Sequence, residues 1–328
     1  MQRRNWLIAI AVAGVVAPNC TLGQQRTKPA RVAILWFTNP ETSAPYRDAL
    51  KLGLRDHGWV EGTDFVFEER WAEGQAARLP ALVKEAVASS PDVIWATDTA
   101  MAVRCKQATD TVPIVFSGSA DPIGAGLVQS LRRPGGNATG LLNPLVDLGP
   151  KLLEFLHAIV PGLSRVAVMR SPLSPTAIAV TTESLEAAAA SLRLALVQLS
   201  ATTSPEIDHA FARIKQERVD GMVIAGGAEY LPHRQQIGEL LIRHRIPGAT
   251  NWRELLPAGA LLSYGHNVAR RVRYSASYVD KILRGVKPAD LPVDQPMRLE
   301  LAVNRKAAMV LGITIPRSVL LRADEVIE

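Results

Sequence analysis

The sequence predicts an α/β protein of two lobes, each built on a doubly wound, mostly parallel sheet with helices on both faces. Segments typical of strands and of helices alternate almost without interruption from residue 31 onward, which is the pattern of parallel sheets. A chain of 328 residues exceeds the size at which a single core stops growing, and 48% of its residues are hydrophobic, enough for two cores. Two strand–helix series of similar length then indicate two lobes of one architecture.

The N-terminus has the layout of a secretory signal peptide. A positive segment (Met1–Arg4) precedes an apolar run (Trp6–Ala17) and a small-residue cleavage site at Thr21–Gly23. The apolar run is shorter than the roughly 20 residues that a transmembrane helix needs. We expect residues 1–23 to be removed and residues 24–30 to form a linker, so that the mature protein works outside the cytoplasm. The arginine pair in the first segment keeps twin-arginine export as an alternative to general secretion.

Cysteine, histidine and charge usage exclude several classes of protein. Cleavage near Gly23 removes Cys20 and leaves Cys105 as the only cysteine, so we expect no intramolecular disulfide. None of the six histidines has metal-ligand spacing, and we expect no metal site. The net charge of +6 is weakly basic, and its densest cluster, Arg270–Arg273, lies on an apparent helix. We interpret this cluster as a solvated helix face and expect no nucleic-acid partner.

The first strand–helix series forms the N-terminal lobe. Residues 32–37 are a continuous apolar run, and Tyr46, Leu50 and Leu54 share one face of the helix that follows and ends at Gly58. Asp98 is placed to cap a later helix. The expected strands are 32–37, 65–71, 93–96 and 112–116, and the expected helices after the first are 78–88, 99–108 and 124–131. Residues 133–137 combine proline, two glycines and asparagine, which indicates a turn and a change of lobe.

The second series repeats this alternation, and the chain then returns to the first lobe. Expected helices are 151–159, 176–191, 205–217 and 233–244, and expected strands are 165–169, 194–199, 221–225, 246–249 and 261–264. After them come a helix that ends at Leu283, a rigid linker at Pro288–Pro292 and a last strand at 298–303. Three connections between the lobes result. We assign 31–140 with 266–291 to one lobe and 141–265 with 292–328 to the other.

Motifs of cofactor and enzyme sites are missing. The loop Thr38–Glu41 after the first strand has no glycine for a dinucleotide, and Gly124–Gly126 lacks the third glycine of that motif. Ser117–Ser119 does not have the spacing of a hydrolase nucleophile elbow. Periodicity places no pair of carboxylates together in a cleft. We therefore expect no cofactor and no catalytic residue.

Polar loops follow nearly every expected strand, at the carboxyl ends where open α/β sheets bind ligands. Each loop precedes a helix whose free N–H groups and positive dipole end suit a carboxylate. A single Ser or Thr in such a loop is better explained as a helix N-cap. The repetition on two facing lobes favours a ligand cleft. Its candidate residues are Thr38, Asn39, Thr97, Thr99, Ser117 and Asp121 in the first lobe, with Asp121 able to balance an ammonium group, and Ser171, Gly227, Asn251 and Trp252 in the second.

Several segments resemble one family, the ABC transporter substrate-binding proteins of the tryptophan or aromatic type. The resemblance extends over essentially the whole mature chain. Its motifs include Gly58–Gly62 (GWVEG), Glu69–Gly74 (ERWAEG), Arg133–Gly140 (RPGGNATG), Tyr278–Gly285 (YVDKILRG), Asp121–Val128, Pro161–Val168 and Leu291–Pro296.

The resemblance implies a periplasmic-binding-protein fold with three interlobe crossings, located in the periplasm. It implies that Thr38, Thr97, Thr99, Ser117 and Asp121 line the cleft. The chain departs from the family's pattern mainly in the second lobe, at residues 170–172 and 226–228, so the identity of the ligand stays open.

We hypothesise that this protein is the solute receptor of an ABC importer. It would capture a small amino-acid-like or carboxylate ligand by hinge closure and deliver it, as a monomer, to an ABC permease driven by a separate ATPase. One alternative is an exported sensor that feeds a membrane receptor, and a less favoured one is an exported enzyme on the same fold. The hinge candidates are Gly140, Leu141, Tyr264, Gly265 and Val293.

Overall fold

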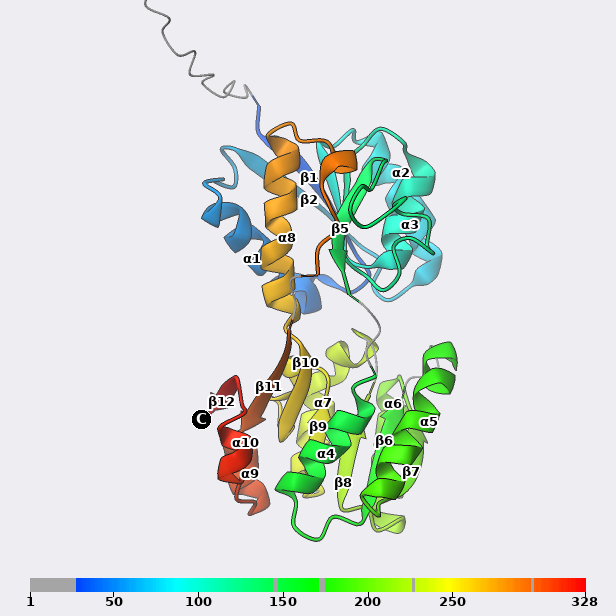
Figure 1. Ribbon diagram of the computed structural model, residues 1–328, viewed down its shortest axis with the longest axis vertical. Helices are drawn as coiled ribbons and strands as arrows, with labels where there is room; N and C mark the ends of the chain where they lie inside the picture. Colours follow the sequence, from blue (N-terminus) through cyan, green and yellow to red (C-terminus); the bar gives the residue numbers. More distant parts are fainter. Residues whose placement is uncertain (1–27, 144–146, 171–174, 226–227, 296–297) are drawn as a thin grey trace, which may run out of the picture.

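The computed structural model describes residues 28–143, 147–170, 175–225, 228–295 and 298–328 (Figure 1). It consists of two lobes, each a sheet with helices on both faces, so the two-lobed α/β fold predicted from the sequence is confirmed. The predicted signal peptide, residues 1–23, lies outside the described residues. Within the described ranges, no helix is both long enough and apolar enough to span a bilayer.

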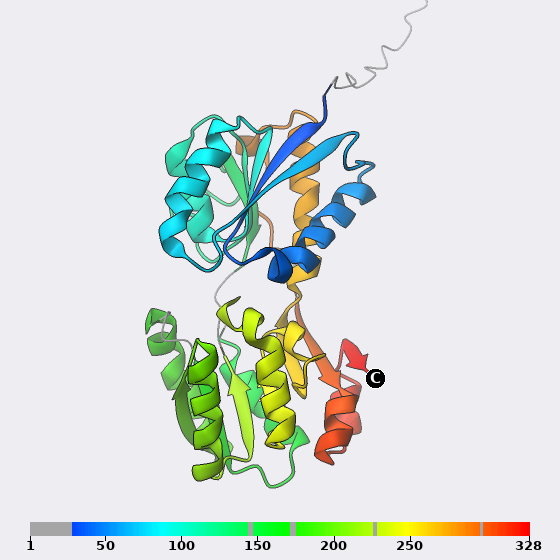
Figure 2. The same ribbon diagram turned by 180° about the vertical axis from the view of Figure 1, so that it is seen from behind.

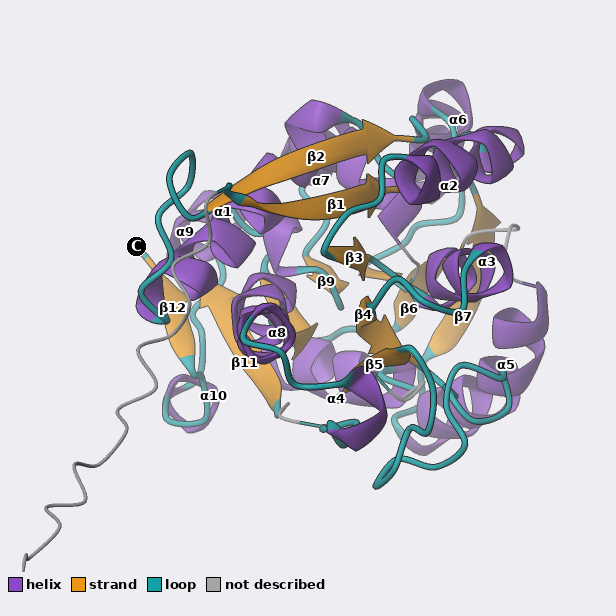
Figure 3. Ribbon diagram, turned by 90° about the horizontal axis from the view of Figure 1, so that it is seen from above, coloured by secondary structure: helices purple, strands orange, loops and turns teal. Residues whose placement is uncertain are grey.

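The first lobe contains a five-stranded parallel sheet with the strand order β2-β1-β3-β4-β5. Its strands are β1 (Ala30–Trp36), β2 (Phe65–Trp71), β3 (Val93–Ala96), β4 (Ile114–Ser119) and β5 (Ala138–Leu142). One face is covered by α1 (Pro40–Asp56) and α8 (Val268–Leu283), and the other by α2 (Leu79–Ala88) and α3 (Thr99–Ala108), as Figure 3 shows. Short 3₁₀ helices η1 (Ala76–Arg78) and η4 (Pro288–Asp290) lie before α2 and after α8. Because helices cover both faces, β3 is apolar along its whole length and β1 is apolar except at Arg31.

The second lobe contains a seven-stranded sheet with the strand order β12-β11-β10-β9-β8-β6-β7, parallel except between β10 and β11. Its strands are β6 (Arg165–Arg170), β7 (Ala195–Ser200), β8 (Gly221–Ile224), β9 (Gly248–Thr250), β10 (Leu262–His266), β11 (Leu299–Asn304) and β12 (Glu325–Ile327). Helices α4 (Gly149–Ile159) and α5 (Pro175–Ser191) cover one face, and α6 (Ser204–Gln216) and α7 (Arg234–Arg243) the other (Figures 1 and 2). The remaining helices are α9 (Arg305–Leu311), α10 (Arg317–Leu320), η2 (Ala228–His233) and η3 (Arg253–Leu255).

The chain crosses between the lobes three times, as the sequence predicted. It passes from β5 to α4, returns from β10 to α8, and passes again from η4 to β11 (Figure 2). The first and third crossings run side by side, because Leu141 forms a parallel bridge with Asp294 and the N–H of Leu142 donates to the Asp294 carbonyl at 2.8 Å. The lobes are therefore joined by backbone at three neighbouring places.

Helix α8 returns the chain to the first lobe and packs closely along α1. Glycine at position 53 permits this contact: a Cβ there would lie 2.3 Å from the carbonyl oxygen of Arg273 and 2.6 Å from Cβ of Ala276. Polar bonds align the two helices, since Nε of Arg273 donates to Asp56 at 2.7 Å and the Trp59 indole donates to Asp280 at 2.8 Å. The position of α8, and of the residues at its N-terminus, thus depends on α1.

The helix predicted at residues 124–131 is wrong. The segment forms consecutive turns, in which the N–H of Ala125 donates to the Asp121 carbonyl and the N–H of Leu127 donates to the Pro122 carbonyl. Gly126 has φ = 69°, a left-handed conformation that ends any helical turn. The glycines at the start of the predicted helix therefore prevent it from forming.

Strand β5 was not predicted, and neither were the short C-terminal elements α9, α10 and β12. The five residues of β5 pair with β4, and Gly140 allows the close approach: a Cβ there would lie 2.1 Å from the Phe116 carbonyl oxygen. The local sequence after the turn at residues 133–137 is too short to show an apolar period. Its strand character depends on β4.

Substitution of Gly53 by Ala should destabilise the protein. Alanine gains roughly 1 kcal/mol of helix propensity over glycine, but the new methyl group clashes with backbone of α8, and overpacking of this kind costs about 1–3 kcal/mol or more. We expect a net loss in the free energy of unfolding, measured by urea denaturation. Asp48→Ala, at an exposed position of the same helix, serves as the control and should change stability by less than about 0.5 kcal/mol. A Gly53→Ala variant as stable as the wild type would contradict this account of the α1–α8 contact.

Candidate functional site

Both lobes present the carboxyl ends of their strands to the junction between them. The first crossing leaves the first lobe from the carboxyl end of β5, and the second leaves the second lobe from the carboxyl end of β10. The other strands of the first sheet are parallel to β5, and β9, β8, β6 and β7 are parallel to β10. The strand ends of two sheets therefore meet at the junction, which is where ligands bind to open α/β sheets.

Arg271, in the first turn of α8, places a half-buried cation at this junction. Its Nε atom is buried, and its guanidinium group has no hydrogen bond or ion pair with any other residue that the structure describes. The guanidinium lies beside the end of β4, where a Cβ on Gly118 would come within 3.2 Å of its Cζ atom. Burial lowers the pKa of Arg271 to about 10, so the side chain remains a cation at neutral pH. Partial burial of a charge without a counter-ion is unfavourable, and a bound anion would offset that cost.

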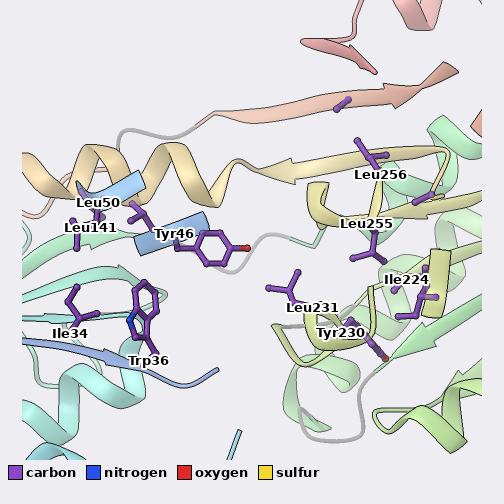
Figure 4. Packing of buried hydrophobic residues seen from close by; sticks show 14 of the residues in the cluster. Ile34, Trp36, Tyr46, Leu50, Leu141, Ile224, Tyr230, Leu231, Leu255 and Leu256 are labelled. Atoms are coloured by element: carbon purple, nitrogen blue, oxygen red, sulfur yellow. The ribbon is translucent and has the colours of Figure 1, made fainter. Parts of the chain in front are cut away.

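Tyr46 of α1 reaches from the first lobe to the second (Figure 4). Its hydroxyl donates a 2.8 Å hydrogen bond to Oε1 of Glu254 in η3. The tyrosine ring belongs to an apolar cluster that continues from Trp36 in the first lobe to Leu231 and Leu255 in the second. Burial, and after it the carboxylate of Glu254, raise the pKa of Tyr46 far above its ordinary value, so the hydroxyl keeps its proton. This bond is a direct polar link between the lobes.

His266 ends β10 at the second crossing. Both of its ring nitrogens are buried and have no hydrogen-bond partner within the described part of the chain. The ring lines a small pocket together with Asn251, Ser263, Asn267 and Glu300. Burial, followed by the positive charge of Arg271, lowers the pKa of His266, which keeps the ring neutral at pH 7. Across the described residues, no three or more His, Cys, Asp or Glu side chains are grouped so as to hold a metal ion.

Several predicted site residues of the first lobe shape the loops at the strand ends. Asn39 is the N-cap of α1, and its Oδ1 accepts a 2.8 Å hydrogen bond from the N–H of Thr42. Thr97 donates to Asp98, the N-cap of α3, at 3.0 Å. The hydroxyl of Thr99 donates to that of Ser119 at 3.0 Å and so joins the ends of β3 and β4.

The other three candidates of the first lobe differ in exposure. Thr38 is half-buried directly after β1, and its carbonyl accepts a 3.3 Å hydrogen bond from Glu73. Ser117 is buried within β4, one residue before Gly118. Asp121 is exposed and closes its own turn, since its Oδ1 accepts a 2.8 Å hydrogen bond from the N–H of Gly124.

Two of the four predicted site residues of the second lobe lie at the carboxyl end of β9. The backbone of Asn251 is so close to β10 that a Cβ on Gly265 would lie 2.3 Å from its carbonyl oxygen. The N–H of Trp252 donates to Oγ1 of Thr250 at 3.1 Å, and its ring packs against the interlobe apolar cluster. The other two candidates, Ser171 and Gly227, lie outside the described residues.

The predicted hinge residues all lie next to a crossing. Gly140 and Leu141 belong to β5, and Tyr264 and Gly265 belong to β10, where they pair with β11. Val293 is buried, and its N–H donates to the Leu131 carbonyl at 2.7 Å. Their positions suit a hinge, and their role in a motion stays a prediction.

Sequence reasoning missed Arg271, Tyr46, Glu254 and His266 as site residues. The cluster Arg270–Arg273 was interpreted as a solvated face, which holds for Arg270 and Arg273 but is wrong for Arg271. The helical period could have identified Arg271. It lies four residues before Ser275, which is fully buried, so the two residues share one face of the helix. A cation on the buried side of an amphipathic helix indicates a partner outside that helix.

Comparison with known proteins points to one family. The family model described as ABC transporter substrate binding protein matches residues 31–327. Among curated proteins, the tyrosine-binding protein of Clostridioides difficile is 23% identical over 274 residues, which are 82% of this chain and 78% of that protein. The family resemblance inferred from the sequence motifs is confirmed.

Solved structures share the same fold. A conserved domain protein of Vibrio cholerae has a TM-score of 0.76 at 29% identity, with 91% of this chain and 100% of that chain covered. An ABC domain of Streptococcus pneumoniae in complex with L-Trp has a TM-score of 0.75 at 24% identity, with 92% of this chain and 100% of that chain covered. Both span the two lobes, and the predicted periplasmic-binding-protein type of fold is confirmed.

His266 should make stability depend on pH. The buried ring has a pKa below the ordinary 6.5 of the unfolded chain, so the unfolded state gains a proton first as the pH falls from 7.5 to 5.5. The free energy of unfolding should fall by up to about 1.4 kcal/mol per pH unit, the limit for one proton. In the variant His266→Gln, urea denaturation at both pH values should show a smaller decrease.

The exposed His209 provides the control for this measurement. His209→Gln should keep the wild-type decrease in stability between pH 7.5 and 5.5. An equal decrease in the wild type and in His266→Gln would show that another group is responsible.

Proposed function

Because the chain belongs to the ABC transporter substrate-binding protein family, we propose that it is the exported solute receptor of an ABC importer. It captures a small amino-acid-like or carboxylate ligand between its two lobes and delivers it to membrane permease subunits. The ligand site is the junction where the strand ends of both sheets meet.

The single observation that carries this proposal is the half-buried guanidinium of Arg271, whose Nε atom is buried without a hydrogen-bond partner among the described residues. Within the described residues it has no counter-ion, and it lies at the strand ends of the first lobe on a helix that begins at a crossing. Arginine binds a carboxylate with two parallel hydrogen bonds. A ligand carboxylate at this place would form an ion pair with Arg271. The affinity of the protein for the ligand would come from this pairing, because folding leaves the charge of Arg271 without a counter-ion.

The relatives support an amino-acid-like ligand. One curated relative is a tyrosine-binding protein, and one solved structure of the same fold holds L-Trp. Tyr46 and Trp36 are aromatic members of the apolar cluster near the junction, and Trp36 stacks at a tilt on Trp95 with ring centroids 5.3 Å apart. We therefore place aromatic amino acids first among the ligands to be tested.

Screening by thermal shift tests the proposal directly. A ligand at 100 times its Kd stabilises the folded protein by about 2.7 kcal/mol, so the correct L-amino acid or small carboxylate should raise the Tm of the protein clearly. The panel should include L-tryptophan, L-tyrosine and L-phenylalanine. If none of its compounds raises the Tm, the result would contradict the proposed function.

Arg271→Met should lower the affinity for that ligand and raise the stability of the free protein. Loss of a charged partner in a buried pair costs about 2–5 kcal/mol of binding, which is roughly 30-fold or more in Kd. Removal of an uncompensated, partly buried charge stabilises the fold. Isothermal titration and urea denaturation measure the two effects. Lys281→Met, at an exposed position near the other end of the same helix, should leave the Kd unchanged. Unchanged affinity in Arg271→Met would exclude Arg271 as the anchor.

We further propose that binding closes the lobes around the three crossings. A ligand that contacts both lobes favours the closed state by its differential affinity for that state. Small-angle scattering should therefore give a smaller radius of gyration with saturating ligand than without it. Equal radii in the two states would contradict closure and would leave ligand capture to be explained by a preformed site.

A further inference from the structure

Glu254 lies at the interlobe junction, where Tyr46 of the first lobe reaches it, and carries a charge opposite to that of Arg271. It lies in η3 of the second lobe, whereas Arg271 lies in α8 of the first. The two side chains act on each other electrostatically, because Glu254 raises the pKa of Arg271 against the larger effect of burial. No ion pair joins them, and Arg271 makes none with any described residue. Glu254 is fixed at the junction by the interlobe hydrogen bond from Tyr46, and Arg271 lies at the end of β4, so a cation and an anion are present at the junction on different lobes without forming an ion pair.

Tyr46 holds the carboxylate of Glu254 in place. Its hydroxyl occupies Oε1 at 2.8 Å, and the tyrosine is only 8% exposed. Oε2 of Glu254 accepts no hydrogen bond from the described part of the chain, so it is available to a donor in the site. The rotamer of a glutamate is costly to immobilise on an exposed surface, and here the buried tyrosine provides that order before any ligand binds.

The carboxylates at the other strand ends are already used. Asp98 caps α3 by accepting the N–H of Met101 at 3.0 Å. Asp121, which the sequence offered as a partner for an ammonium group, is exposed and accepts the N–H of Gly124. Glu254 differs from both, because its partner is a side chain of the opposite lobe. The hydrogen bond that orients Glu254 therefore joins the two lobes and depends on the distance between them.

We infer that Glu254 is a specificity-determining residue that restricts the site to ligands carrying an ammonium group beside their carboxylate. This inference rests on the proposed function, in which Arg271 binds the ligand carboxylate. A zwitterionic amino acid would bridge Arg271 and Glu254 and satisfy both charges. A simple carboxylate would pair with Arg271 but bring a second anion toward Glu254, with no donor for Oε2. Like charges in a water-poor site repel strongly.

Tyr46 acts in this scheme as a positioning residue. It touches Glu254 and fixes where the ammonium group must lie. Loss of its hydroxyl should therefore weaken the discrimination between the two classes of ligand and leave the anchoring of the carboxylate by Arg271 intact.

The test compares each amino acid with its deamino counterpart. Isothermal titration gives the Kd of L-tryptophan and indole-3-propionate, and of L-tyrosine and 3-(4-hydroxyphenyl)propionate, for the wild type, Glu254→Gln and Tyr46→Phe. We expect the wild type to prefer one amino acid over its counterpart by at least about tenfold. Glu254→Gln, which keeps an oxygen for Tyr46, should bind that amino acid at least about tenfold more weakly and its counterpart equally well or better. Tyr46→Phe should reduce the preference by a smaller factor.

Matched variants separate specificity from folding. Glu239→Gln, an exposed carboxylate of the same lobe, should retain the wild-type preference. Circular dichroism and the Tm should show that Glu254→Gln is folded. If Glu254→Gln weakened the binding of the amino acid and of its deamino counterpart equally, Glu254 would have a structural role and the inference would be overturned. A wild type that binds both partners equally would overturn it as well, while the proposed function would stand. Binding of neither partner of either pair would overturn the proposed function and the inference together.

Discussion

The direction of the interlobe crossings is the constraint on which the rest of the structure depends. The chain leaves β5 and β10 at their carboxyl ends. Because the other strands of the first sheet are parallel to β5, and β9, β8, β6 and β7 are parallel to β10, these strand ends are directed at one junction. Parallel strands place the N-termini of the following helices at the same edge. Loops, helix starts and backbone connections are thereby concentrated in the small region between two rigid cores.

The charged groups at that junction are held in place by the packing of the elements around them and not by ion pairs with each other. Arg271 is held there by the packing of α8 on α1, and that packing depends on a glycine at position 53. His266 stays neutral beside it, which avoids a second cation at the same place. Glu254 accepts a hydrogen bond from Tyr46 of the opposite lobe and forms no ion pair with Arg271. The site is therefore polar and preorganised, with charges available to a ligand.

The local sequence predicted helices and strands well where a segment has a clear apolar period whose residues become buried. It failed where contacts with distant residues determine the conformation. Leu50 and Leu54 are fully buried on the predicted face of α1. The hydroxyl-rich loops do lie at strand ends, but Asn39 serves there as a helix cap, the alternative that the sequence could not separate from ligand binding. Residues 124–131 have helical composition but turn at Gly126, because a left-handed glycine outweighs the propensity of its neighbours.

The sequence by itself determined the α/β class, the two lobes, the three crossings and the family, because these depend on repeated patterns and on motifs spread along the chain. Only the tertiary structure decided which charged groups face the junction. Arg270, Arg271 and Arg273 are alike in sequence, yet only Arg271 has a buried Nε without a partner among the described residues. Tyr46 and Glu254 are more than 200 residues apart and meet only when the lobes are assembled. Burial and long-range contact set their chemistry, and neither can be read from neighbours along the chain.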